Sequence, residues 1–123
     1  FSNANFHQAQ MSGACFTAAI LHRTDFSQAQ IDRADFSQVQ MSDANYARAN
    51  LENAILSAAN VTQSNFSDAI MTNCVGVALK ATSTNFVQAD LRQCRFASSS
   101  LKNSNFLRAK LDDADLQGAN LKG

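Results

Sequence analysis

The chain has no proline and no tryptophan, and only four of its 123 residues are glycine. Folds with many tight turns usually carry more turn-forming residues, so this composition predicts a domain with few such turns. No apolar run approaches the ~20 residues of a membrane-spanning helix, and no transmembrane segment is expected. Neither sign of charge is in excess, because ten Lys and Arg balance ten Asp and Glu. This balance disfavours direct binding of nucleic acid.

Apolar residues make up 46% of the chain, a fraction that is typical of globular proteins and argues against disorder. The length allows one domain, spanning residues 1–123. Within this domain the sequence repeats every five residues without losing phase. Of the 25 positions counted in fives from Phe1, which we call centre positions, 23 hold a large apolar residue.

A second class of position accompanies the first. The residue two before each centre, which we call the small position, is Ala at 15 of 24 places. A period of five fits neither the 3.6-residue period of a helix nor the two-residue period of a strand. It fits a coil that turns every five residues, with the centre residue inward and the small residue at the corner. Four sides close a square of 20 residues, and such squares stack about 4.8 Å apart.

Three units show the repeat most clearly: Ala44–Arg48 (ANYAR), Ala49–Asn53 (ANLEN) and Ala119–Gly123 (ANLKG). They resemble the A(D/N)LXX motif of the pentapeptide repeat family, and the resemblance extends over the whole chain. It implies an all-β fold, a right-handed quadrilateral parallel β-helix of about six coils.

A square coil also predicts a second period of 20 residues, because centre residues 20 apart stack on one side. One such column is entirely aromatic and is predicted to form the core: Phe6, Phe26, Tyr46, Phe66, Phe86 and Phe106. The residue before each of these is a short amide or acid, which predicts a hydrogen-bonded ladder of stacked side chains: Asn5, Asp25, Asn45, Asn65, Asn85 and Asn105.

One coil departs from the pattern. Its centre positions hold Gly76 and Ala81, and a small position holds Leu79. Leu79 is expected to fill the space left by Ala81. Gly76 predicts a local bulge or kink.

No catalytic, cofactor-binding or metal-binding residues are expected. His7 and His22 fall on adjacent sides without carboxylates at metal-ligand spacing, and the acidic cluster around Asp112 is more typical of a solvated turn. Cys74 and Cys94 occupy small positions 20 residues apart and are expected to be buried free thiols. Parallel side chains about 4.8 Å apart do not suit disulfide geometry.

One side of the predicted rod is low in charge. The two residues after its centre positions are uncharged in every coil, and apolar residues gather in its middle. Exposed apolar patches often mark protein contacts. The candidate contact residues are Cys15, Ile55, Ala58, Ile70, Val75, Val77, Ala78 and Ala97. The side that carries Met11, Leu51 and Leu91 holds more charged residues and is predicted to face solvent.

These features favour a non-enzymatic structural or protein-interaction module, a rod that binds a protein partner or a second copy of itself. Two alternatives come from the family resemblance. Some pentapeptide repeat proteins modulate DNA gyrase by mimicking duplex DNA, but that mechanism requires a negatively charged rod, and this chain is neutral. Others belong to the lumen or the complexes of photosynthetic membranes. A cytoplasmic location is expected for a bacterial source, and the thylakoid lumen is an alternative for a photosynthetic one.

The end of the rod is a second candidate contact surface. The first coil presents Phe1, Phe6 and Met11 under a rim that lacks charged side chains. Repeat proteins usually cover such an end with a polar cap. We expect this end to be covered by further residues, by a second copy or by a partner.

Overall fold

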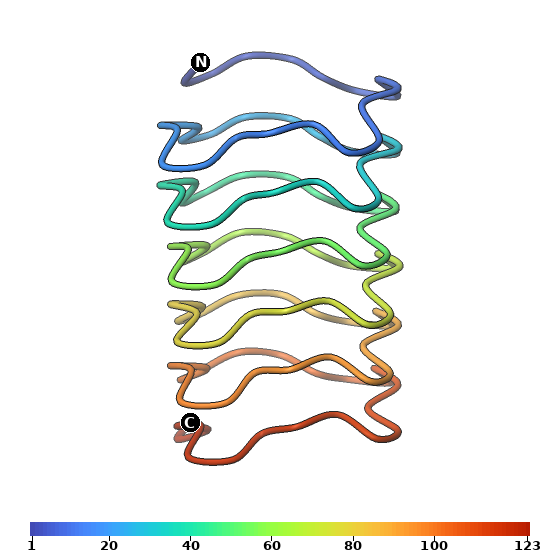
Figure 1. Ribbon diagram of the computed structural model, residues 1–123. Coiled ribbons are helices and arrows are strands. Elements are labelled where there is room, and N and C mark those ends of the chain that lie inside the picture. Colours follow the sequence, from blue (N-terminus) through green and yellow to red (C-terminus); the bar gives the residue numbers. More distant parts are fainter.

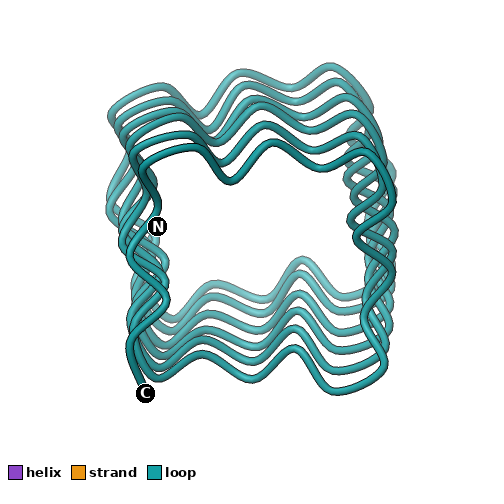
Figure 2. Ribbon diagram, turned by 90° about the horizontal axis from the view of Figure 1, so that it is seen from below, coloured by secondary structure: helices purple, strands orange, loops and turns teal.

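The computed structural model describes all 123 residues as one continuous stack of coils (Figure 1). It contains no helix and no continuous strand, and thus no helix that could span a membrane. Residues 1–120 form six coils of 20 residues, and the stack is square when viewed along its axis (Figure 2). This right-handed quadrilateral β-helix confirms the fold predicted from the periods of five and 20.

Single-residue β-bridges hold the coils in register. The residue before each centre, which we call the bridge position, pairs in parallel with the residue 20 further along, as in Asn45 with Asn65 and Ile55 with Val75. From Phe6 to Leu101, the backbone N–H of each centre residue adds a bond to the coil below, such as Phe66 N–H to Asn85 O at 2.7 Å. Every coil is therefore joined to its neighbours on all four sides.

The corners lie at the two residues after each centre. The small residue closes the turn, as where Ala49 N–H donates to Tyr46 O at 3.0 Å, and is not itself the corner that the periodicity predicts. The second turn residue adopts a left-handed backbone conformation, with φ between 55° and 62° at 22 non-glycine positions. None of these residues is β-branched, since branching at Cβ strongly disfavours this conformation.

The expectation of few tight turns was therefore wrong. A turn recurs every five residues although glycine is scarce. Up to Asn103, the strain at the left-handed residues is offset by a hydrogen bond to the next coil, for example Arg48 N–H to Ser67 O at 2.9 Å. Composition cannot reveal this support, because it comes from residues 19 positions away.

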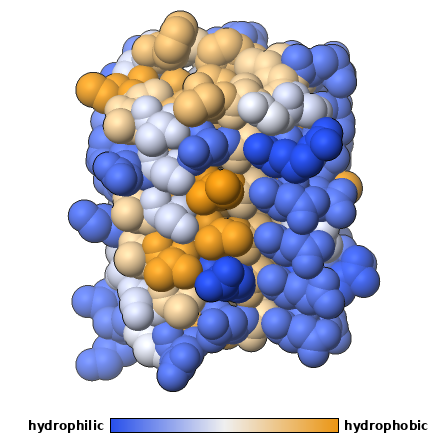
Figure 3. All heavy atoms as spheres, in the orientation of Figure 1, coloured by the Kyte–Doolittle hydropathy of each residue, from blue (hydrophilic) through white to orange (hydrophobic).

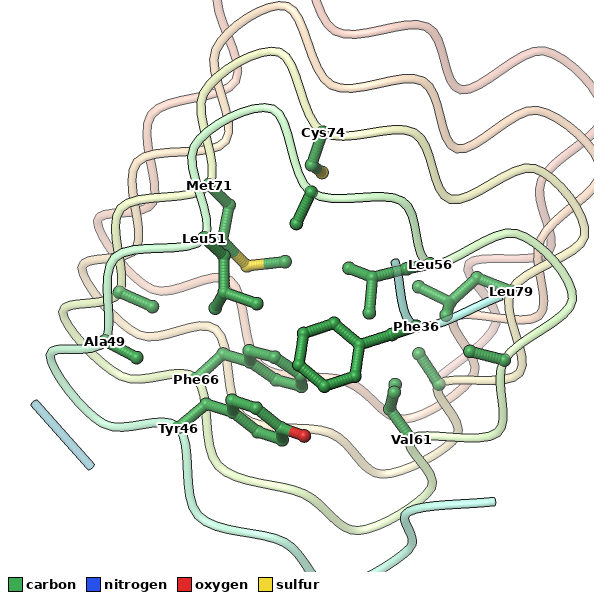
Figure 4. Close-up of a cluster of buried hydrophobic side chains, with 14 of the residues drawn as sticks. Phe36, Tyr46, Ala49, Leu51, Leu56, Val61, Phe66, Met71, Cys74 and Leu79 are labelled. Carbon is green, nitrogen blue, oxygen red and sulfur yellow. The ribbon is translucent and has the colours of Figure 1, made fainter. Parts of the chain in front are cut away.

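The centre and small residues fill the interior, as the close-up in Figure 4 shows. Rings of the aromatic column stack with centroids 4.8 Å apart between Tyr46 and Phe66 and 5.3 Å apart between Phe66 and Phe86. Phe26, Tyr46, Phe66 and Phe86 are fully buried. Phe6 and Phe106 are half-buried, because they lie in the first and last coils and are covered from one side only.

The amide ladder forms beside this column over four of its six predicted members, from Asp25 to Asn85, and does not extend to Asn5 or Asn105. Asn85 Nδ2 donates to Asn65 Oδ1 at 2.9 Å, Asn65 Nδ2 to Asn45 Oδ1 at 3.3 Å, and Asn45 Nδ2 to Asp25 Oδ1 at 3.1 Å. The same Oδ1 atoms accept backbone N–H groups of the following turn, such as Ser67 N–H at 3.1 Å. Each amide thus links two coils and one corner.

The coil around Gly76 is regular, so the predicted bulge is wrong. Gly76 N–H donates to Arg95 O at 2.8 Å, and Leu79 N–H donates to Gly76 O at 3.1 Å, as in most other turns. The Phe96 ring of the next coil occupies the space where a side chain would lie, since a Cβ at Gly76 would be 2.9 Å from Phe96 Cδ1. Leu79 reaches the same space, with its Cδ2 3.5 Å from that Cβ position.

Buried hydroxyls at small positions join neighbouring coils. Ser64 Oγ donates to Met41 O at 2.9 Å and accepts Ala44 N–H at 3.1 Å. It is therefore inserted between the two backbone groups that close the turn in other coils. Ser104 is inserted in the same way between Ala81 O and Thr84 N–H.

We expect Ser64→Ala to lower the free energy of unfolding by about 1 kcal/mol, because two buried backbone groups lose their partner. Urea titration of both proteins measures this difference. Ser67→Ala, which removes a hydroxyl at a turn position outside the core, is the matched control and should be within about 0.5 kcal/mol of the parent. An unchanged Ser64→Ala protein would show that the turn contracts to restore the direct bond.

Candidate functional site

The uncharged surface predicted from the sequence runs along one corner of the square. The turn positions that follow Phe16, Phe36 and their stacked equivalents carry no charge in any coil. The flat face beside this corner, which lies towards the viewer in Figures 1 and 3, is different. Its outward column contains charged residues as well as apolar ones: Cys15, Asp35, Ile55, Val75, Arg95 and Asp115.

Six of the eight candidate contact residues are brought together in the middle of the rod. We call this group the apolar patch, and it consists of Ile55, Ala58, Val75, Val77, Ala78 and Ala97. Ile55 and Val75 form a bridge pair on the flat face, and Ile55 is 39% exposed. Figure 3 shows a hydrophobic group at mid-height on this face, with hydrophilic residues above and below it.

The other two candidates lie apart from the patch. Cys15 is exposed, but Asp35 separates it from Ile55 in the same column. Ile70 is 47% exposed and lies on the adjoining side, beyond the polar turn formed by Thr72 and Asn73. The sequence analysis grouped Cys15 with the patch because the two share a column, and it grouped Ile70, on the adjoining side, as a neighbour.

Asp35 sets the charge at the upper edge of the patch. Its Oδ1 accepts Ser37 N–H at 2.8 Å, and its Oδ2 accepts the Thr17 hydroxyl at 3.0 Å. Hydrogen bonds from Ser37 hold the pKa of this carboxyl below its ordinary value, with a smaller contribution from Thr17 and against the opposing effect of burial. The carboxylate is therefore charged at neutral pH and marks one boundary of the patch.

Because the pKa of Asp35 is lower in the folded chain, its contribution to stability is present above the unfolded pKa of about 3.9 and is lost as the pH falls through the folded value. The pKa values of Asp25, Asp32 and Asp90 are also lowered in the folded chain. We expect the free energy of unfolding to fall below about pH 4. Urea titrations at several pH values measure the fall, and it should be smaller in Asp35→Asn than in the parent. Parallel curves would contradict the assignment.

No concave, convergent site accompanies the patch. The surface has one depression, and no hydrophobic residue lines it: Thr72, Asn73, Arg92, Gln93, Asp112 and Asp113. His7 and His22 each form a hydrogen bond through Nδ1 to a serine hydroxyl one coil further on, Ser27 and Ser42 respectively, at 2.8 Å. No three metal-ligating side chains gather at one place.

At the N-terminal end, Phe1 is 79% exposed and Phe6 is half-buried. The expectation that this end is covered stays a prediction, and light scattering on the 123-residue chain measures whether it self-associates.

Two family models match the chain. One describes a pentapeptide repeat region and matches residues 48–123, and the other describes pentapeptide repeats in eight copies and matches residues 1–38 and 16–45. No curated protein matches the sequence.

Solved structures share the fold. A pentapeptide repeat protein from the Arabidopsis thaliana thylakoid lumen is 24% identical, with a TM-score of 0.62 over 78% of this chain and 63% of that one. The chain thus spans less than two thirds of that protein's length. Rfr23 from the cyanobacterium Cyanothece 51142 is 16% identical, with a TM-score of 0.57 over 91% of this chain and 90% of that one. QnrB1, a plasmid-mediated fluoroquinolone resistance protein, is 16% identical, with a TM-score of 0.60 over 97% of this chain and 71% of that one.

Proposed function

Since this chain belongs to the pentapeptide repeat family, we propose that it is a non-enzymatic module that binds a protein partner through the apolar patch. The observation that carries the proposal is the placement of Ile55, Val75 and Val77 together at the surface of two consecutive coils. Exposed groups of this kind have a favourable free energy of burial and commonly form the centre of a protein contact.

The rigid backbone supports this role. Ile55 and Val75 are bridged to the coils on both sides, and turn bonds join Ala58 N–H to Val77 O and Ala78 N–H to Ala97 O, so binding requires little ordering of the chain. A stable interface involves about 20–30 residues on each side, so the patch supplies its apolar centre and the surrounding serines and asparagines supply the rim. Asp35 lies above the patch and Arg95 lies below it. They favour a partner that presents a basic group to Asp35 and an acidic group to Arg95.

Modulation of gyrase is the less favoured alternative. QnrB1 shares the fold, but a likeness at 16% identity carries no function to this chain. The chain has equal numbers of acidic and basic residues, and ion pairs such as Arg92 with Asp90, at 2.7 Å, place opposite charges side by side. A rod of this kind does not reproduce the continuous negative charge of duplex DNA. We expect no effect in a gyrase supercoiling assay with and without a fluoroquinolone.

A photo-crosslinking amino acid at position 77 tests the proposal. We expect it to capture a defined protein from the source organism, whereas the same group at position 87 should not. Val77 and Val87 are matched, since both are half-buried first turn residues, but Val87 follows Phe86 on a different side of the rod. Capture of the same proteins at both positions would contradict a patch-specific partner.

With the captured protein purified, Val77→Glu should weaken binding at least tenfold, or about 1.4 kcal/mol, because a charge would be buried in the apolar centre of the contact. Val87→Glu should leave the affinity within twofold of the parent. Isothermal titration measures both, and circular dichroism checks that both variants stay folded. Equal losses in the two variants would overturn the assignment of the patch.

A further inference from the structure

Two of the three cysteines meet inside the rod. Cys74 and Cys94 occupy equivalent small positions in the fourth and fifth coils, and both are fully buried. Cys74 points inward, as Figure 4 shows. Arg95 N–H donates to Cys74 O at 2.9 Å, so the backbones of the two coils are in register at this place. The two thiols thus face each other across one coil step.

The sulfur atoms are closer than the coil spacing requires. Equivalent atoms in neighbouring coils are about 4.8 Å apart, whereas Cys74 Sγ lies 2.8 Å from Cys94 Sγ. The two side chains therefore lean towards each other. The coil step itself falls within the 4.4–6.8 Å range of Cα separations that disulfides tolerate. Both thiols are buried and free, as the sequence predicts, and their sulfur atoms lie within hydrogen-bond distance of each other.

We propose that Cys74 and Cys94 are a redox-active pair that closes to a disulfide joining the fourth and fifth coils. With a hydroperoxide as oxidant, one thiolate attacks the terminal peroxide oxygen, the O–O bond breaks, and a sulfenic acid and an alcohol form. The sulfur of the second cysteine then attacks the sulfenic sulfur, and the S–O bond breaks as water leaves. Two electrons and two protons pass from the thiols to the oxidant, so the chain loses two hydrogen atoms.

The environment makes this oxidation slow and its product durable. Cys74 Sγ–H donates to Cys94 Sγ, and Cys94 Sγ–H donates to Met71 O at 2.8 Å. The hydrogen bond with Cys94 and burial both raise the pKa of Cys74, so little thiolate is present at neutral pH. Oxidant and reductant reach the pair when the coil opens locally, which suits a lasting cross-link better than a rapid switch.

The third cysteine has a different role. Cys15 is exposed in the first coil, three coil steps above Cys74, or about 14 Å along the rod. It cannot reach either buried sulfur in the folded chain, and it is open to bonds between molecules. The folded structure therefore selects one of the three pairings that the cysteines allow.

The test is oxidative refolding of the Cys15→Ser variant, which has only the buried pair. Refolding in the presence of hydrogen peroxide should give a monomer lighter by two hydrogen atoms, with a cross-linked peptide that contains residues 74 and 94. The apparent melting temperature should rise by about 5–10 °C relative to the reduced protein and return on reduction, because the bond closes a 20-residue loop. The matched control is Cys15→Ser with Cys94→Ser, since Ser99 shows that a serine at a small position donates to the preceding coil in the same way. It should show no such shift.

The wild-type chain gives the second measurement. Refolded in peroxide, it should contain the bond between Cys74 and Cys94 in at least nine molecules of ten, with Cys15 still available to iodoacetamide. The same oxidation in denaturant should give a mixture that includes pairs with Cys15. The proposal is overturned if the refolded chain shows that mixture, if sulfinic acid forms in place of the disulfide, or if the bond lowers the melting temperature.

Discussion

Phe66→Ala is expected to lower the free energy of unfolding by about 3–5 kcal/mol, the largest effect of any single substitution that we consider. The ring lies in the middle of the aromatic column, stacked 4.8 Å from Tyr46 and 5.3 Å from Phe86, and is fully buried. Its removal leaves a cavity that cannot close, because the coil step is fixed by backbone hydrogen bonds on all four sides. Urea or thermal unfolding measures the loss.

The position along the rod supplies a control for this prediction. Phe106→Ala, in the last coil, removes the same ring from a half-buried site and should cost clearly less than Phe66→Ala. Ser67→Ala, one residue after Phe66 and outside the core, should cost less than about 0.5 kcal/mol. Similar losses in Phe66→Ala and Ser67→Ala would contradict the inward and outward assignment of the repeat.

Gly76→Leu is expected to destabilise the chain by about 1–3 kcal/mol or more, although it restores the sequence pattern. Leucine stands at two equivalent places of the same column, Leu56 and Leu116, so the repeat alone would favour it. In the structure even a Cβ at position 76 would lie 2.9 Å from Phe96 Cδ1 and 3.0 Å from its Cε1. Replacing glycine also restricts the unfolded chain, which offsets about 0.4–1 kcal/mol of the cost.

A double substitution separates the clash from other causes. Phe96→Leu removes ring atoms from the space around position 76, so Gly76→Leu should be less destabilising in that background than in the parent. The double-mutant cycle, measured by urea unfolding, should give a coupling of at least about 0.5 kcal/mol in the stabilising direction. A Gly76→Leu protein more stable than the parent would show that the pattern outweighs the packing here.

Much of the architecture follows from the order of the amino acids alone. The period of five, the second period of 20, the aromatic column and the amide ladder are all readable from the sequence, and the structure has each of them. The reason is that every contact in a stacked coil joins residues at fixed separations. Local patterning and tertiary packing therefore repeat with the same period, and the sequence shows both.

Three features were decided by the tertiary structure. The corners fall after the centre residue because the left-handed turn residue is held by a bond to the next coil, which no local preference reveals. Gly76 is regular because Phe96, 20 residues on, fills its side-chain space. Cys74 and Cys94 approach each other because their side chains lean out of parallel. The sequence determines which residues share a column, but the conformations of their side chains depend on how neighbouring coils divide the space between them.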